Sequence, residues 1–270
     1  AHAGEFYSVA CAALWAVACA RPLATALNLL LLALGIATIT VLLLATQQIE
    51  ERLQRDAGGI DLGAGAKGSP MQLILSAVFH IDVPAGNIPL AEAKALAADR
   101  LVKKAIPLAL GDSFRGFRIV GSTHDYPALY GAQTVAGRLW ERPMEAVLGA
   151  DAARVAGMGV GARFAGAHGL GEGGDEHART PYSVVGVLAP TGSVLDRLVL
   201  TSIESVWVIH EHGSQGGDPE KLLSAMDEEE KEITALLIQY ASPLAAATLP
   251  RKINASSALQ AASPAYETAR

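Results

Sequence analysis

Four histidines in the second half of the chain have the side chains best suited to chemistry. His168 and His177 lie in one glycine-rich segment, and His210 and His212 come directly before another. Neutral imidazoles, with the carboxylates found beside them here, are ligands that zinc accepts in proteins. His210 and His212 would also share one face of an extended chain. We treat these four histidines as candidate metal ligands. The alternative, which we prefer, is that they are ordinary solvated loop positions.

A glycine-rich segment near the middle of the first half resembles a phosphate-binding loop. Residues 63–69 read GAGAKGS. A phosphate loop needs the order Gly-Lys-Ser/Thr, so that backbone N–H groups surround the phosphate and the hydroxyl holds magnesium. Here Lys67 precedes Gly68. A second segment, 169–174, matches G-x-G-x-x-G but no helix is expected after it. We therefore expect neither nucleotide binding nor any other cofactor.

No set of residues has the spacing of a catalytic site. Ser113 lies in Gly-Asp-Ser-Phe-Arg, which lacks the second glycine of a nucleophile elbow. Asp112, His124 and Asp125 could form a carboxylate–imidazole set, but their spacing does not require it. We therefore expect that the chain is not an enzyme, that it has no catalytic residues and that it does not hydrolyse nucleotides.

The element that must position everything else is the uncharged run Leu23–Ala45. About 20 apolar residues in a helix span the roughly 30 Å hydrocarbon core of a bilayer, and this run is long enough. A secretory signal has a shorter apolar core after a basic segment. A buried core helix of a soluble protein would show a polar stripe, and none is convincing here. The run is predicted to be a transmembrane helix.

The composition fits one membrane span followed by one water-soluble domain. Of the 270 residues, 51% are hydrophobic, and the mean hydropathy is +0.30. The formal net charge of −6 comes with no basic patch, which argues against nucleic acid as a partner. The two cysteines, Cys11 and Cys19, both precede the span. A cysteine-free domain suits an oxidising periplasm.

Four segments follow from these patterns. Residues 1–21 are predicted to be an interfacial helix, 22–46 the transmembrane helix, 47–58 a polar helical stalk and 59–270 the main domain. Residues 48–270 should behave as an autonomous soluble domain. Charge does not decide the orientation, because few cations flank the span on either side.

The main domain shows an α+β pattern, with short strands, few long helices and many glycine turns. Residues 63–70 are predicted to be a loop, 71–81 are ambiguous between strand and helix, and 256–270 are mildly helical. Strands are expected over 60–62, 105–110, 114–121, 145–148, 161–165, 182–188, 197–200 and 233–240, and helices over 90–101, from 151 onward, 203–210 and 242–249.

Several segments together resemble one family of membrane proteins. The span and its flank, 21–35, are followed by IDLGAGAKGSPMQLIL, GDSFRGFRIVGSTHD, VLGA and YSVVGVLAPTGSVLD. As a set, these segments resemble the N-terminal part of an ABC transporter permease of the MacB/FtsX/LolC-E type. The resemblance covers nearly the whole chain, although no single motif is specific.

The resemblance implies a MacB-like periplasmic core domain, with the N-terminus in the cytoplasm and the main domain beyond the bacterial inner membrane. Further spans would follow Arg270. The partners would be a separate ABC ATPase subunit, a second copy of the permease and membrane lipid. ATP hydrolysis by that subunit would move the periplasmic domain, with 47–56 as the lever and Arg21-Pro22 as the hinge. The alternative is a membrane-anchored periplasmic binding or sensor protein, metal-related or not. The substrate is undetermined.

Overall fold

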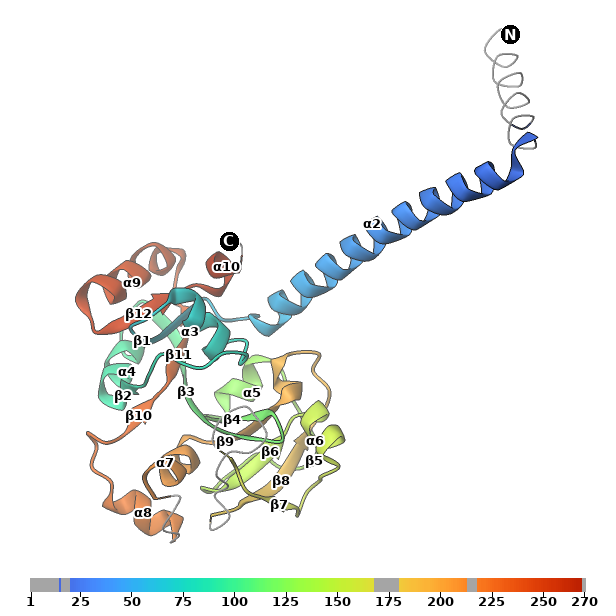
Figure 1. Ribbon diagram of the computed structural model, residues 1–270. Helices are drawn as coiled ribbons and strands as arrows, with labels where there is room; N and C mark the ends of the chain where they lie inside the picture. The colour runs from blue at the N-terminus through green and yellow to red at the C-terminus, as the bar shows by residue number, and fades with distance from the viewer. Residues whose placement is uncertain (1–14, 16–19, 168–179, 213–217, 269–270) are drawn as a thin grey trace. The chain divides into compact units, whose positions relative to one another are not determined.

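The computed structural model describes residue 15 and residues 20–167, 180–212 and 218–268 (Figure 1). The chain divides into two units, Ala1–Arg52 and the compact unit Leu53–Arg270. A 35-residue helix, α2 (Pro22–Asp56), contains the apolar run and continues without a break into the polar stalk. Its last turn, from Leu53 on, belongs to the compact unit.

Helix α2 exposes apolar side chains along its whole first part. The exposed fractions run from 85% at Leu23 to 52% at Leu44. By length and composition this helix can cross a membrane. The hydroxyl groups of Thr38 and Thr40 donate to the carbonyls four residues earlier, both at 2.8 Å, so these polar groups are satisfied within the helix, as lipid requires. The predicted apolar helix is confirmed, and the chain remains helical through Asp56.

The compact unit is built on a ten-stranded sheet and a two-stranded sheet. The strands are β1 (Leu62–Ala66), β2 (Ile88–Pro89), β3 (Val102–Phe114), β4 (Phe117–Ser122), β5 (Thr134–Gly137), β6 (Glu145–Leu148), β7 (Arg163–Phe164), β8 (Tyr182–Leu188), β9 (Leu198–Ser202), β10 (Glu232–Ile233), β11 (Ala235–Tyr240) and β12 (Leu259–Ala262). The helices of this unit are α3 (Pro70–Ala77), α4 (Leu90–Ala97), α5 (Asp125–Leu129), α6 (Ala150–Ala156), the 3₁₀ helix η1 (Val194–Arg197), α7 (Ile203–His212), α8 (Pro219–Ala225), α9 (Pro243–Ser256) and α10 (Pro264–Glu267).

One half of the unit, the first lobe, has a split βαβ topology. Its strands lie in the order β12-β1-β11-β3, and every neighbouring pair is antiparallel. The chain runs from β1 through α4 to β3, and later from β11 through α9 to β12, which is the β-α-β-β-α-β arrangement of ferredoxin-like folds.

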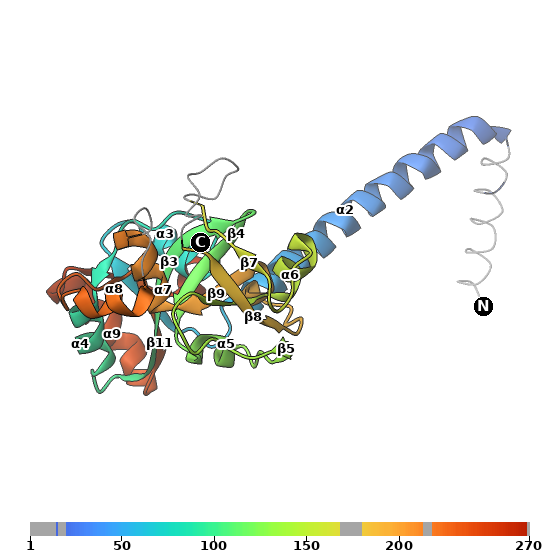
Figure 2. The same cartoon turned by 90° about the horizontal axis from the view of Figure 1, so that it is seen from below.

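The second lobe is inserted between β3 and β11. It continues the same sheet in the order β4-β9-β6-β8-β5, with parallel pairs β4–β9 and β6–β8. The 13-residue strand β3 pairs with β11 of the first lobe and with β4 of the second, so it joins the two. In Figures 1 and 2, α4 and α9 lie at one end of this unit and β5 and α6 at the other.

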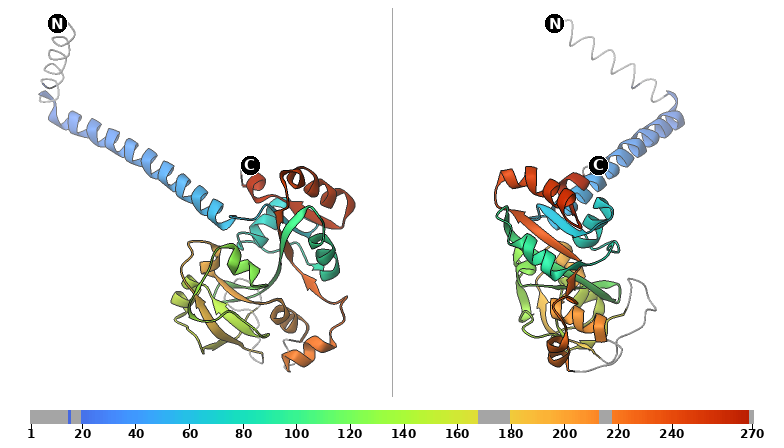
Figure 3. Two further views of the ribbon diagram at one scale, coloured as in Figure 1. Left: turned by 180° about the vertical axis from the view of Figure 1, so that it is seen from behind. Right: turned by 90° about the vertical axis from the view of Figure 1, so that its left-hand side faces the viewer.

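Three apolar clusters cover the two faces of the long sheet. One face carries a single cluster that runs through both lobes under α3, α5 and η1. On the other face, α4 and α9 cover the first lobe, and α6 with β7 covers the second. Helix α7 contributes to both clusters of that face. Helix α10 lies against α3 (Figure 3). The predicted α+β fold is confirmed.

A tight turn corrects the strand predicted over 114–121. Phe114 ends β3, and Phe117 begins β4, with Arg115 and Gly116 between them at φ 49° and 81°. Positive φ at both positions is typical of the two-residue turn that suits a hairpin's twist. The alternating pattern therefore belonged to two paired strands and not to one.

The loop predicted over 63–70 is wrong for its first half, because Leu62–Ala66 forms β1 in the middle of the first lobe's sheet. Glycines occupy this strand because α3 packs close to it. A Cβ at Gly65 would lie 2.7 Å from Leu73 Cδ1. The ambiguous segment that follows is the helix α3, whose first turn is capped by the Ser69 hydroxyl accepting from the Gln72 amide.

The C-terminal segment also differs from the prediction. Residues 259–262 form the edge strand β12, and α9 continues through Pro250 to Ser256 instead of ending at 249. The strand exists because β12 pairs with β1, and such pairing overrides weak local preference. The interfacial helix expected over 1–21 lies almost wholly outside the described residues.

Candidate functional site at the base of the membrane helix

Asp56 is the point at which α2 enters the folded unit. It is the last residue of the helix and its one buried residue, with 3% exposure. Its Oδ2 accepts a hydrogen bond from Arg197 Nη2 at 3.1 Å, in an ion pair whose side chains are 4% and 34% exposed. Removing one partner of such a buried pair leaves an uncompensated charge, so the two residues depend on each other.

Tyr130 holds the backbone of the same helix end. Its hydroxyl donates to the carbonyl oxygen of Asp56 at 2.6 Å. The last carbonyls of a helix have no partner within the helix, and this hydrogen bond satisfies one of them. Burial, and then the charge of Asp56, raises the pKa of Tyr130, so the phenol keeps the proton that it donates.

A second pair of side chains extends these contacts into the core. The Tyr126 and Tyr130 rings meet edge to face with centroids 5.8 Å apart, and the Tyr126 hydroxyl lies 2.8 Å from His80 Nε2. Burial, together with the charges of Arg118 and Arg197, lowers the pKa of His80 to about 3. The imidazole is therefore neutral at physiological pH. We refer to Asp56, Arg197, Tyr130, Tyr126 and His80 as the helix-base network.

The network joins elements from both lobes. His80 follows α3 of the first lobe, the two tyrosines lie on and just after α5, and Arg197 ends η1 directly before β9. Sequence reasoning singled out 47–56 as a lever but missed these partners. Tyr130 and Arg197 lie 74 and 141 positions from Asp56, and no local pattern connects positions so far apart.

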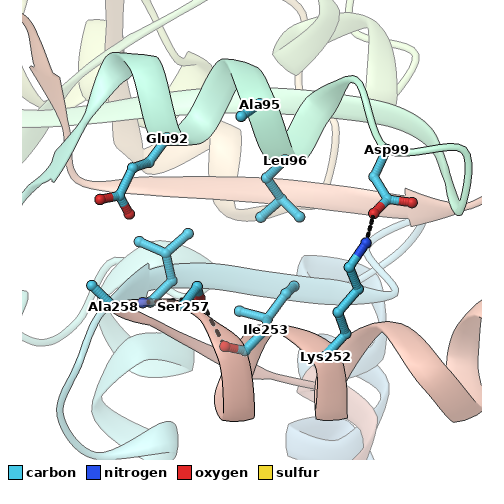
Figure 4. A pocket seen from close by; sticks show the side chains of 9 residues that line it. Glu92, Ala95, Leu96, Asp99, Lys252, Ile253, Ser257 and Ala258 are labelled. Atoms are coloured by element: carbon cyan, nitrogen blue, oxygen red, sulfur yellow. Dashed lines mark hydrogen bonds and ion pairs between the residues drawn. The ribbon is translucent and has the colours of Figure 1, made fainter.

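A groove between α4 and α9 is a second candidate site (Figure 4). Its volume is about 480 Å³, and its apolar part is formed by Leu96, Ile253 and Leu259. Lys252 crosses one end and pairs with Asp99 at 2.5 Å. The hydrogen bond from Lys252, and then the one from the Leu101 amide, lowers the pKa of Asp99, so the pair stays ionised near neutral pH.

Comparison with known proteins identifies the family. The model of the MacB-like periplasmic core domain matches residues 25–255. The chain belongs to this family. Among solved structures, the periplasmic region of MacB from Actinobacillus actinomycetemcomitans is similar at 12% identity, over 80% of this chain and 94% of that one, with a TM-score of 0.49. The extracellular domain of the noncanonic ABC-type transporter YknZ from Gram-positive bacteria is similar at 13% identity, over 75% and 98%, with a TM-score of 0.41. No curated protein matches.

The chain thus carries a MacB-like ABC transporter permease periplasmic domain, which is part of a transporter and not a classical enzyme. The glycine-rich segment 63–69, which resembled a phosphate-binding loop, begins as a strand of the sheet. Its first glycines lie in β1 under α3. His124 and Asp125, two members of the possible carboxylate–imidazole set, each interact with a different partner. His124 Nε2 lies 2.7 Å from the Trp140 carbonyl oxygen, and Asp125 pairs with Lys104.

Of the four histidines that were candidate metal ligands, two lie among the described residues. His168 and His177 lie outside the described residues. Positions 210 and 212 lie on α7 and are about 200° apart around its axis, so they do not have the shared face of an extended chain. Among the described residues, no group of three His, Cys, Asp or Glu side chains could hold a metal ion. Zinc binding by these histidines stays a prediction, which calorimetric titration at neutral pH would test.

Proposed function

We propose that this chain is the N-terminal part of a permease subunit that couples ATP hydrolysis by a separate ATPase to movement of its periplasmic domain. The observation that carries the proposal is the continuity of α2. A helix able to cross a membrane ends on a residue held inside a MacB-like core domain. A helix that served only as an anchor would need no buried contact at its end.

The movement follows from a shift between two arrangements. ATP binding by the partner subunit favours one arrangement of the membrane helices and of the domain. It can shift the equilibrium between the two arrangements only by the difference between its binding free energies for them. The N-terminus lies in the cytoplasm beside the ATPase and the domain lies in the periplasm. A second copy of the permease completes the assembly, and membrane lipid surrounds the exposed apolar side chains of α2.

Co-purification from membranes tests this proposal. The complete reading frame, tagged and expressed with the ATPase encoded beside it, should retain that ATPase through detergent extraction, and the ATPase activity should depend on the permease. A complete frame that adds no further apolar spans beyond residue 270, and that retains no ATPase, would refute the proposal.

The groove between α4 and α9 favours a second candidate, a membrane-anchored binding protein. Its volume lies within the roughly 300–1,000 Å³ range of ligand pockets, and it combines apolar walls with an ion pair. An apolar fluorescent probe should then bind the domain, and Ala95→Trp, which fills the groove from α4, should abolish binding. Equal binding by the variant would exclude this groove as the site.

A further inference from the structure

We propose that the helix-base network makes the membrane helix act on the second lobe, so that a displacement of the last turn of α2 reaches β9 and α5. This inference rests on the proposed function only for the source of the displacement. The attachment itself is a property of the domain.

The covalent path from α2 leads elsewhere. After Asp56 the chain passes through residues 57–61 into β1 of the first lobe. This connector contains two adjacent glycines, and Gly59 has φ 79°, a conformation that favours glycine. The connector is held to β11 of the first lobe, because Gln239 Nε2 donates to the Gly59 carbonyl oxygen at 2.8 Å and the Asp61 amide donates to the Ile238 carbonyl oxygen at 3.0 Å. The covalent path therefore connects the helix with the first lobe, and any action on the second lobe needs another path.

The side-chain path is shorter and leads to the second lobe. Arg197 holds the Asp56 carboxylate and is followed at once by β9, which pairs with β4 and β6 in the middle of that lobe's sheet. Tyr130 holds the Asp56 carbonyl from the end of α5. Two directional bonds therefore connect one residue of the helix with two elements of the same lobe.

Packing gives the attachment a defined position. Leu53 and Ala57, on either side of Asp56, pack against the apolar cluster that runs through both lobes. The Tyr126–His80 pair then connects the tyrosines with the end of α3 in the first lobe. The helix end thus lies where the two lobes share one core, and its polar bonds favour the second lobe. A displacement carried by these bonds changes the relation of the second lobe to the first.

Hydrogen exchange on the full chain in lipid nanodiscs tests the attachment. Arg197→Met removes the ion pair, and Tyr130→Phe removes the hydroxyl group that donates to the Asp56 carbonyl and also interacts with the Tyr126 hydroxyl. We expect exchange of the amides at 53–58 to become at least tenfold faster in both variants. Glu145→Gln is the matched control, because Glu145, the first residue of β6, forms a partly buried ion pair with Arg138 and is not part of the helix-base network. Unchanged exchange at 53–58 in Arg197→Met and Tyr130→Phe would overturn the inference. If Arg197→Met does not fold, Tyr130→Phe decides alone.

A distance measurement tests the transmission. Spin labels at Leu244 of the first lobe and Val160 of the second, both exposed, report the relation of the lobes in a variant without Cys11 and Cys19. With the ATPase partner present, ATP should change this distance in the parent chain and in Glu145→Gln, but by less in Tyr130→Phe, which retains only the bond from Arg197. A full change in Tyr130→Phe would refute the transmission. An absence of change in every chain would refute the proposed function, while the exchange experiment would still decide on the attachment.

Discussion

His80 is the residue whose ionisation should control the stability of the domain between pH 5 and 7. Its pKa is lowered from 6.5 to about 3, so the unfolded state takes up a proton that the folded state does not. The contribution of His80 to the free energy of unfolding is fully present above about pH 6.5 and is lost as the pH falls toward 3. Between pH 7.5 and pH 5.0 the free energy of unfolding should fall by about 2 kcal/mol.

We expect His80→Asn to remove most of this pH dependence, because asparagine does not titrate and accepts the positive φ of 56° at this position. Denaturant unfolding of residues 53–270 at the two pH values measures the effect. Glu145 does not interfere, since its pKa is lowered from 4.5 to about 2, mainly by Arg138, and it affects stability only below about pH 4.5. An equal loss of stability in the variant would assign the pH dependence to other groups.

At the scale of single elements, β8 depends on a glycine. A Cβ at Gly186 would lie 2.2 Å from the Arg138 carbonyl oxygen, where only a backbone shift could accommodate it. We expect Gly186→Ala to destabilise the domain by about 3 kcal/mol. Gly159→Ala is the control, because nothing lies within 4 Å of its added Cβ, and it should stay within about 0.5 kcal/mol of the parent. Thermal unfolding compares the two variants. Similar melting temperatures would contradict the close approach of the Arg138 carbonyl oxygen to position 186.

The outer edge of β12 is covered by one side chain of α9. Asn254 Oδ1 accepts from the Ala261 amide at 2.7 Å, and its Nδ2 donates to the Ala261 carbonyl at 3.2 Å. An open edge strand can pair with another chain. We expect Asn254→Ala to self-associate with rising concentration in analytical ultracentrifugation. Thr248→Ala, on the exposed face of the same helix, should stay monodisperse. A monodisperse Asn254→Ala would show that the edge needs no cover.

At the scale of the whole molecule, the folded unit begins inside the helix and not after it. Residues 53–270 should form a soluble, monodisperse domain with mixed α/β circular dichroism. Residues 57–270 lack Asp56 and leave Arg197 without its carboxylate, so we expect them to be less stable by about 2 kcal/mol, below the full cost of a broken buried pair because Arg197 is partly exposed. Denaturant midpoints compare the two fragments, and equal midpoints would mean that the last turn of α2 adds nothing.

The sequence by itself determined the features that a short window of residues encodes. The apolar run 23–45, the helix predicted over 90–101 and the strand predicted over 182–188 came from local sequence. The run lies in α2, the strand matches β8, and the helix is present as α4, although it ends at Ala97. The resemblance of several segments to MacB-type permeases likewise needed no structure. Tertiary structure decided where distant segments meet. β12 is a strand because β1 lies beside it, and the glycine at position 65 leaves room for Leu73 of α3. Asp56 was distinguished from the rest of the predicted lever, 47–56, only when Arg197, 141 positions away, proved to be its partner. No local propensity records such a contact, because its free energy arises only when the folded chain brings both groups out of water together.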